Sequence, residues 1–405
     1  MDSRRKFLGR VATGLAGTLA AGPASVLGAS ERVRVGIVGV GDRGTELLQQ
    51  IRACPNTEVV AFADAYQQRL ERAQAGVPGS VIHRDYRRVL DDTSIDAVVI
   101  ATPQHLHAEQ FCAALSAGKH IYLEKTAALT VEQAKRMRAA YREDQGRHVV
   151  QIGHQSCSFG HVADVRQFLA DPQRLGKITS IAMRMHRAAP LTKAQWARPA
   201  LLTPDVNADN VDWRAFLGGA ATRDFDAHRL IHWRYFWEYS GGSVFENMSQ
   251  QLSFWYKTLD LQIPNTATMD GGVYLWKDGR EVPDTVSLSL QQPEEIMVSW
   301  VSGSGNGQPG ISEDVLGTHG TIQRASQVRY VPQRINRPDG AEITGVTAHK
   351  PHAHMENFLD AIRYGKEPNC PFETGYRVSI ACRMAVESYH QWRTVRWDAE
   401  REEIV

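Results

Sequence analysis

The sequence predicts an α/β fold, in which a parallel, doubly wound sheet is followed by an α+β region with an open, mainly antiparallel sheet. Up to about residue 153, short apolar strands alternate with helical stretches, which is typical of parallel sheets. Beyond this point the composition changes, because all nine tryptophans lie at or after Trp196. The 405 residues also exceed what one hydrophobic core usually supports. We therefore expect two domains, at residues 31–153 and 154–405.

A glycine-rich turn follows the first apolar strand, residues 35–38. Glycines at such spacing allow a tight turn, a close backbone approach to a pyrophosphate and close packing of helix on strand. The helix expected at residues 45–53 would direct free N–H groups at the phosphates. The pattern predicts a dinucleotide-binding Rossmann domain, with an ordinary strand–turn–helix as the alternative. The residues of this turn expected to contact the cofactor are Gly39, Gly41, Asp42, Arg43 and Gly44.

A second predicted strand, residues 58–63, ends at Asp64, which lies 20 residues after Gly44. A carboxylate is needed at about this place to accept hydrogen bonds from the adenosine ribose. Because it would also repel a 2′-phosphate, NAD is favoured over NADP as cofactor. Arg43 and Arg69 could offset that repulsion, which leaves NADP as the less favoured alternative.

Three further strands are expected at residues 96–101, 120–123 and 149–152, and polar residues follow the first two. In open α/β sheets, ligands bind beyond the carboxyl ends of the strands. These ends should therefore converge with the glycine turn on one crevice. The additional cofactor-binding residues predicted there are Thr102, Pro103, His105, His107, Glu124 and Lys125.

The second domain is expected to form its sheet from strands at residues 178–185, 266–276, 286–290 and 296–301, several of which alternate with period two. Loops at 188–210 and 302–307 could lie over the site. A helical pattern at 373–392 would pack the C-terminus against the body. The open face of such a sheet would be a natural surface for a homo-oligomer.

The first 29 residues predict an export signal. Arg4 and Arg5 precede Phe7, and residues 11–27 are apolar and carry no charge. The paired arginines resemble a twin-arginine signal, with small residues for cleavage near Ala29. Several glycines and Pro23 disfavour the alternative, an uncleaved membrane anchor. We expect a periplasmic or otherwise exported protein that is not inserted in the membrane after cleavage.

Composition narrows the choice of partners and metals. The chain has 46 basic and 45 acidic side chains, so charge gives no argument for nucleic acid or an anionic membrane surface. Five widely spaced cysteines without a C-x-x-C pattern predict neither a disulfide framework nor a zinc site. His352 and His354 lack a nearby third ligand, so we expect no metal. The expected partner is a small molecule.

Segments along nearly the whole predicted mature chain share the pattern of one family. They read ATPQHLH at 101–107, AGKH at 117–120, EK at 124–125, DWRAFLG at 212–218, HWRYFW at 232–237, GTHGT at 317–321 and NFLDAI at 357–362. In these segments the chain resembles the glucose–fructose oxidoreductase/inositol dehydrogenase (Gfo/Idh/MocA) family, and its exported bacterial members in particular. The resemblance implies an NAD(P)-dependent oxidoreductase that acts on a carbohydrate or polyol.

Lys125 is the main catalytic candidate. Hydride transfer from a secondary alcohol requires removal of the hydroxyl proton and stabilisation of the charge on oxygen. Lys125 follows a buried strand beside the expected nicotinamide position and could serve either purpose. The alternative is a surface lysine at a strand end.

In the family, this lysine is usually partnered by an Asp and a His four residues apart on a helix, so that both side chains point from one face. The matching positions here are Glu246 and Gln250. An amide cannot act as general base, so Gln250 can only orient a hydroxyl by hydrogen bonds. Proton transfer would then fall to Lys125, Glu246 or an imidazole from elsewhere. His228 and His232 are the candidates for that imidazole, with a structural or loop histidine as the alternative for either. Thr126, where the family usually carries Pro, removes no chemistry.

An aromatic stretch after His228 suits the apolar faces of a sugar ring, with core packing as the alternative. The residues expected at the substrate are His232, Trp233, Arg234 and Tyr239.

Three functions remain open from the sequence. The first is an exported oxidoreductase with a tightly bound cofactor, since an exported enzyme has no cofactor pool to exchange with. The second, also implied by the family, is a redox-neutral glycosidase or lyase, in which the sugar is oxidised transiently and takes the hydride back. The third is a non-catalytic dinucleotide-binding protein.

Overall fold

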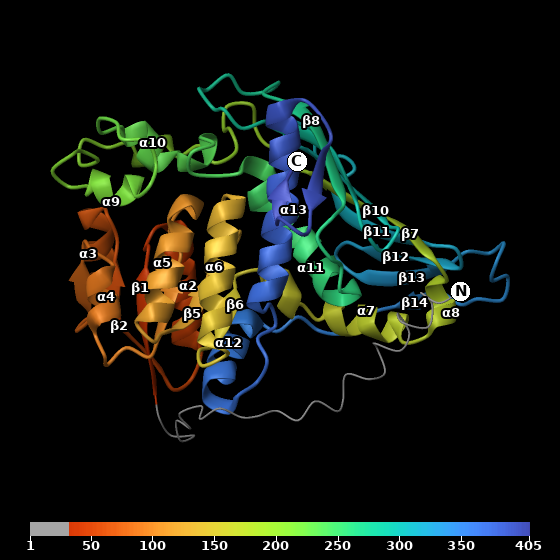
Figure 1. Ribbon diagram of the computed structural model, residues 1–405, viewed down its shortest axis with the longest axis horizontal. Coiled ribbons are helices and arrows are strands. Elements are labelled where there is room, and N and C mark those ends of the chain that lie inside the picture. The colour runs from red at the N-terminus through yellow and green to blue at the C-terminus, as the bar shows by residue number, and fades with distance from the viewer. Residues whose placement is uncertain (1–31) are drawn as a thin grey trace.

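The computed structural model describes residues 32–405, which form two sheets with helices packed on and between them (Figure 1). The N-terminal sheet is parallel and the C-terminal sheet is mainly antiparallel, so the predicted fold class is confirmed. The export signal predicted at residues 1–29 lies outside the described residues.

The first sheet has six parallel strands in the order β3-β2-β1-β4-β5-β6. Its strand order reverses between β1 and β4, which is where open α/β sheets bind ligands. Helices cover both faces, and every residue of β4 is therefore buried. The strands are β1 (Val33–Val38), β2 (Thr57–Ala63), β3 (Val81–His83), β4 (Ala97–Ile100), β5 (His120–Leu123) and β6 (Val150–Ile152); the helices are α2 (Asp42–Ala53), α3 (Gln67–Gly76), α4 (Arg87–Asp91), α5 (His107–Ser116) and α6 (Val131–Asp144).

The second sheet has ten strands in the order β14-β13-β12-β11-β7-β10-β9-β8-β15-β16. Neighbouring strands are antiparallel except for β10 and β7, which pair in parallel. The bounds are β7 (Ile178–His186), β8 (Thr266–Gly272), β9 (Thr285–Gln291), β10 (Met297–Gly303), β11 (Ile311–Gly317), β12 (Gly320–Arg324), β13 (Val328–Pro332), β14 (Ile343–Thr344), β15 (Val395–Asp398) and β16 (Glu403–Ile404).

Strand β8 ends at Gly272, earlier than the predicted residue 276. The reason is the Asp284 carboxylate, which accepts the backbone N–H groups of Tyr274, Leu275 and Trp276 at 2.9–3.2 Å. These donors are thereby withdrawn from the sheet ladder.

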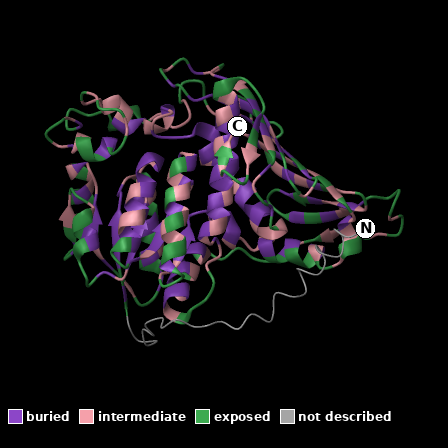
Figure 2. Cartoon of the chain, viewed as in Figure 1, coloured by how far each residue is buried: buried purple, intermediate pink, exposed green. Residues whose placement is uncertain are grey.

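Helices of the C-terminal region pack against both sheets and connect them. Figure 1 shows α13 between them, and Phe372 at its start stacks on Tyr141 of α6 at 4.6 Å. Helix α12 packs Met355 and Phe358 into the core beneath the first sheet. Buried residues therefore continue from one sheet to the other (Figure 2). The helices are α7 (His161–Leu169), α8 (Pro172–Leu175), α9 (Trp213–Leu217), α10 (Ala227–Ile231), α11 (Ser249–Leu259), α12 (Ala353–Tyr364) and α13 (Phe372–Gln391).

Residues 196–239, here called the covering segment, lie over the carboxyl end of the first sheet, with α9 and α10 above α3 and α5 (Figure 1). The segment is joined to the loop after β2, because Asp212 N–H donates to the Ala65 carbonyl at 2.7 Å and Tyr66 forms a β-bridge with Val211. Its apolar residues form a separate small core with Tyr66. Within residues 32–405, no helix has the length and apolar character needed to cross a membrane.

Candidate active site

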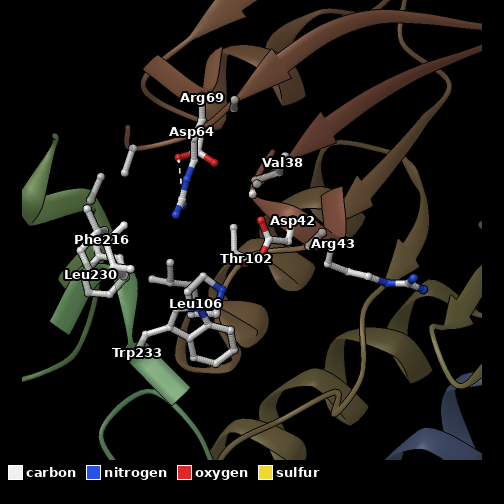
Figure 3. A pocket seen from close by; sticks show the side chains of 18 of the residues that line it. Val38, Asp42, Arg43, Asp64, Arg69, Thr102, Leu106, Phe216, Leu230 and Trp233 are labelled. Atoms are coloured by element: carbon white, nitrogen blue, oxygen red, sulfur yellow. Dashed lines mark ion pairs between the residues drawn. The ribbon is translucent and has the colours of Figure 1, made fainter. Parts of the chain in front are cut away.

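The glycine turn opens on a cleft at the carboxyl end of the first sheet (Figure 3). Gly39 has φ +88°, and a Cβ on it would lie 2.8 Å from the Ala101 backbone. A Cβ on Gly44 would lie 1.9 Å from the Gly39 carbonyl oxygen, so both glycines are needed for packing. Helix α2 begins at Asp42 without a side-chain cap, which leaves its first N–H groups free to bind an anion. The turn therefore fits a pyrophosphate.

Asp64 ends β2 with a buried carboxylate in the wall of this cleft. Its Oδ2 accepts the Val40 N–H at 2.8 Å and its Oδ1 accepts the Tyr66 N–H at 2.9 Å. A carboxylate has about four acceptor positions, so it can still accept hydroxyl groups of a ribose. Arg69 lies 3.9 Å from Oδ1 (Figure 3), and Arg84 also lines the cleft. Both positive charges therefore face the part of the cleft in which Asp64 would bind the ribose.

The covering segment closes the cleft from the other side. Figure 3 shows Phe216, Leu230 and Trp233 facing the strand ends that carry Val38 and Thr102. Arg198 extends from the same segment to within 3.5 Å of the Asp42 carboxylate. Trp196 and Leu201 line the cleft beside it. A dinucleotide in this cleft would therefore be enclosed on two sides.

His105 and His107, predicted to contact the cofactor, lie behind the lining of the cleft. His107 bonds the carbonyl oxygens of Thr102 at 2.9 Å and Thr126 at 3.0 Å, and so joins two of the loops at the site. His105 bonds the Phe216 carbonyl of the covering segment at 2.7 Å. Burial lowers the pKa of His105 to about 4 and lowers that of His107 as well. Both are neutral hydrogen-bonding residues that shape the crevice.

Lys125 and Glu246 form the centre of the site. The Lys125 Nζ lies 3.0 Å from the Glu246 carboxylate and 3.1 Å from its backbone carbonyl. Arg234 Nε donates to the same carboxylate at 3.1 Å, and Gln104 Nε2 donates at 2.8 Å. Burial would raise the pKa of Glu246, but the charges of Lys125 and Arg234 outweigh it and hold this pKa at about 2. Glu246 is therefore an anion near neutral pH and a poor proton acceptor.

Glu246 lies in a π-helical turn, Val244–Met248, that runs directly into α11. Such turns recur at functional sites, and their wider spacing changes which residues share a face. Gln250 lies four residues after Glu246. Unlike Glu246, it forms no hydrogen bond with Lys125 within residues 32–405. It lines a second cavity instead. Thr126 fastens the lysine turn to the π-helical turn, since its hydroxyl donates to the Phe245 carbonyl at 2.9 Å.

The other predicted catalytic and substrate residues are placed around this centre. The His228 ring packs against that of His232, with the centroids 4.5 Å apart and the planes tilted by 43°, and His232 Nε2 accepts the Arg198 N–H at 2.9 Å. Both rings thus support the covering segment, and in the described chain no hydrogen bond links His228 to Lys125. Tyr239 is fully buried against His105 and lies in the small core. Of the predicted substrate residues, the cleft is lined by His232, Trp233 and Arg234.

The second cavity, of about 310 Å³, lies beside Gln250 between the turn after β6 and strands β11 and β12. Its most buried polar group is Glu313, which is paired with Arg324 and accepts hydrogen bonds from Gln251 at 3.0 Å and Trp255 at 2.7 Å. Sequence reasoning missed this cavity, because its residues are far apart in the chain and carry no motif. It also missed Gln104, whose polar side chain in the segment 101–107 was the available signal.

Comparison with known proteins decides the family of the cofactor domain. Residues 33–154 match the oxidoreductase family with an NAD-binding Rossmann fold, Gfo/Idh/MocA. The domain belongs to this family. Inositol 2-dehydrogenase 1 of Saccharopolyspora erythraea is 37% identical over 125 residues, which cover 30% of this chain and 36% of that protein. Glycosyl hydrolase family 109 protein 1 of Bacteroides thetaiotaomicron is 33% identical over 112 residues, or 25% of this chain and 24% of that protein. The chain thus spans 36% of the first relative and 24% of the second.

Similarity to solved structures extends over both domains. A levoglucosan dehydrogenase in complex with NADH and levoglucosan has a TM-score of 0.70 and 19% sequence identity. The match covers 90% of this chain and 99% of that chain. At this identity the likeness establishes the fold of both sheets.

Proposed function

We propose that this protein is an NAD(P)-dependent oxidoreductase that transfers a hydride to or from a carbohydrate or polyol and keeps its cofactor tightly bound. The observation that carries the proposal is the Lys125–Glu246 pair, with Nζ to carboxylate at 3.0 Å, at the strand end next to the NAD-binding cleft. The inositol dehydrogenase relative and the levoglucosan dehydrogenase structure support the substrate class.

The residues of the site have separable roles in this proposal. The glycine turn and Asp64 would hold the nicotinamide cofactor, which when bound supplies the hydride acceptor or donor. Lys125 would donate a hydrogen bond to the reacting oxygen and carry the proton to or from it. Glu246 would keep Lys125 in place, because its own carboxylate is occupied by Lys125, Arg234 and Gln104.

The proposed cofactor preference and retention rest on the two walls of the cleft. The Asp64 carboxylate favours a ribose diol and hence NAD, whereas Arg69 and Arg84 in the same wall oppose that preference. The covering segment would slow the exit of a bound dinucleotide, since Trp233 and Phe216 stand over the strand ends. This enclosure supports retention of the cofactor.

We further propose export through the twin-arginine route, which rests on residues 1–29 of the sequence alone. The N-terminal sequence of mature protein from the periplasm tests it, with cleavage expected near Ala29. We also propose a homo-oligomer, because the open face of the second sheet exposes Met297, Val301 and Leu316. Nucleic acid and a membrane surface are not proposed as partners.

A second candidate is a redox-neutral glycosidase or lyase. Gln250 in place of a histidine and the family 109 glycosyl hydrolase relative favour it. A non-catalytic dinucleotide-binding protein is the least favoured candidate, since the paired Lys125, Glu246 and Arg234 have no binding role in it.

One experiment separates the three candidates. Purified protein is incubated with a panel of sugars, polyols and glycosides, and both nicotinamide absorbance and released sugar are followed. A change in absorbance supports the oxidoreductase, and released sugar without a net change in absorbance supports the second candidate. Bound nucleotide with no turnover of any compound would leave the non-catalytic protein.

A further inference from the structure

His154 is a buried imidazole beside the lysine turn that has no role in the site described above. It lies two residues after the end of β6, and β6 pairs with β5, which Glu124 and Lys125 follow. Its side chain has 0% exposure, and within residues 32–405 neither ring nitrogen has a hydrogen-bond partner of normal geometry. Buried polar groups are nearly always hydrogen-bonded, so a ring in this state indicates a partner close by.

Gln250 is the group that the fold brings to this ring. Ser156, two residues after His154, donates from its hydroxyl to the backbone carbonyl oxygen of Gln250 at 2.7 Å. The same hydroxyl forms a hydrogen bond with the Ser253 hydroxyl at 3.0 Å. The turn after β6 is therefore fastened to the first turn of α11. The Gln250 Oε1 is itself buried and without a partner in the described chain. Two unsatisfied side chains thus come from two elements that are held together.

The count of donors and acceptors around His154 is complementary. Lys125 has three N–H donors, and two of them are used by the Glu246 carboxylate and backbone carbonyl. A neutral imidazole has one donor and one acceptor, and Gln250 Oε1 can only accept. The free donor of Lys125, the His154 ring and the free acceptor of Gln250 can therefore be joined by two hydrogen bonds that leave none of the three groups unsatisfied.

The ring is neutral under ordinary conditions. Burial lowers the pKa of His154 to about 3, the neighbouring Lys125 and His354 act in the same direction, and the hydrogen-bonding Gln250 opposes them. A group with so low a pKa is a poor proton acceptor at neutral pH. His154 is therefore not the missing general base, and the bridging role fits its charge state.

We propose that His154 is a positioning residue whose ring accepts a hydrogen bond from Lys125 Nζ and donates one to Gln250 Oε1. This bridge fixes the Gln250 amide so that its NH2 group faces the second cavity. There it would donate to a hydroxyl or ring oxygen of a polyhydroxylated ligand. The ligand class rests on the proposed function, whereas the bridge itself does not.

Nitrogen NMR of the holoprotein labelled at histidine tests the bridge without any substrate. The chain has 15 histidines, and His154→Phe identifies the signal by its loss. We expect a neutral ring down to about pH 5, far below the usual histidine range. Gln250→Leu should shift this signal, and Gln155→Leu, which alters the same cavity, should leave it in place. A ring that titrates above about pH 6, or that ignores Gln250→Leu, would overturn the proposal.

Kinetics test the consequence for ligand binding. His154→Phe should raise KM for the sugar by about tenfold, the loss of one hydrogen bond, with a smaller change in kcat. His154→Gln keeps a donor and an acceptor and should recover part of the loss. Nucleotide content and the unfolding temperature show that each variant folds. Wild-type protein that turns over no sugar refutes the proposed function, while the NMR result still decides the bridge. An unchanged KM in an active His154→Phe enzyme contradicts the positioning role.

Discussion

Thr126 donates its hydroxyl to the Phe245 carbonyl oxygen at 2.9 Å and is fully buried. This one bond joins the turn that carries Lys125 to the π-helical turn that carries Glu246. The relative position of Lys125 and Glu246, the proposed catalytic pair, therefore depends on a side chain that has no part in the proposed chemistry.

Thr126→Val should test that dependence. The change keeps the shape of the side chain but removes the donor, which should cost about 1 kcal/mol of unfolding free energy. Turnover should fall as well, because Lys125 loses its fixed position relative to Glu246. Thr126→Ser keeps the hydroxyl and is the matched control. Urea unfolding and steady-state kinetics measure both effects; a Val variant as active as the Ser variant would contradict the argument.

Lys125→Met should lower turnover by about a hundredfold or more, as expected when a positioned proton donor or oxyanion partner is lost. Folding and nucleotide content should be largely retained, since Glu246 keeps Arg234 and Gln104 as partners. Gln250→Ala should cost less, mainly in KM. If Gln250→Ala reduces kcat as strongly as Lys125→Met, the roles of the two residues are assigned wrongly.

Glu246 makes stability depend on pH in a predictable direction. Its pKa falls from 4.5 to about 2 on folding, so its contribution is present above about pH 4.5 and is lost as the pH falls toward 2. A shift of this size corresponds to roughly 3 kcal/mol of unfolding free energy at neutral pH. Glu246→Gln should therefore be less stable than wild type at pH 7, and the difference should shrink below about pH 4.5. Urea titrations across this range measure it, and a difference that grows toward low pH would contradict the assignment.

The sequence was sufficient where the signal was local. Gly39, Gly41 and the strand-end Asp64 each lie within one strand–turn unit, and all three line the cleft. It was insufficient where a contact depends on distant elements. Gln104 and Glu246 are 142 positions apart, and their contact at 2.8 Å exists only because the π-helical turn and the segment 101–107 meet.

The same reasoning explains the residues that were placed differently. His105 and His107 occupy a motif position, but a pattern does not show on which side of a loop the ring lies. Both rings turn inward to bond carbonyl oxygens. Tyr239 belongs to an aromatic stretch in which some side chains are buried and others are partly exposed. Its burial in the small core makes it a packing residue.

Asp64→Ala should weaken NAD binding and narrow the gap between NAD and NADP affinity, because a carboxylate favours a ribose diol and repels a 2′-phosphate. Asp64→Asn is the control that removes the charge but keeps one acceptor oxygen for the Val40 or Tyr66 N–H, so it separates the effect of the charge from that of the local hydrogen bonds. Arg69→Ala should act in the opposite direction and widen the gap. Titrations of nucleotide-free protein with both cofactors measure the ratio, and an unchanged ratio in Asp64→Ala would remove this residue from the cofactor site.

Retention of the cofactor is the prediction that connects the covering segment to export. In the proposed export route, a cofactor loaded in the cytoplasm must survive transport, and no comparable pool exists outside to replace it. Protein purified from the periplasm and then denatured should therefore release nearly stoichiometric NAD(H).

Trp233→Ala removes an indole that lines the cleft and should hasten loss of nucleotide during gel filtration. Trp392→Ala is the matched control, because that indole is 80% exposed and belongs to the C-cap of α13. Equal loss from both variants would remove the covering segment from this role, and wild-type protein that arrives empty and works only with excess added NAD would refute retention itself.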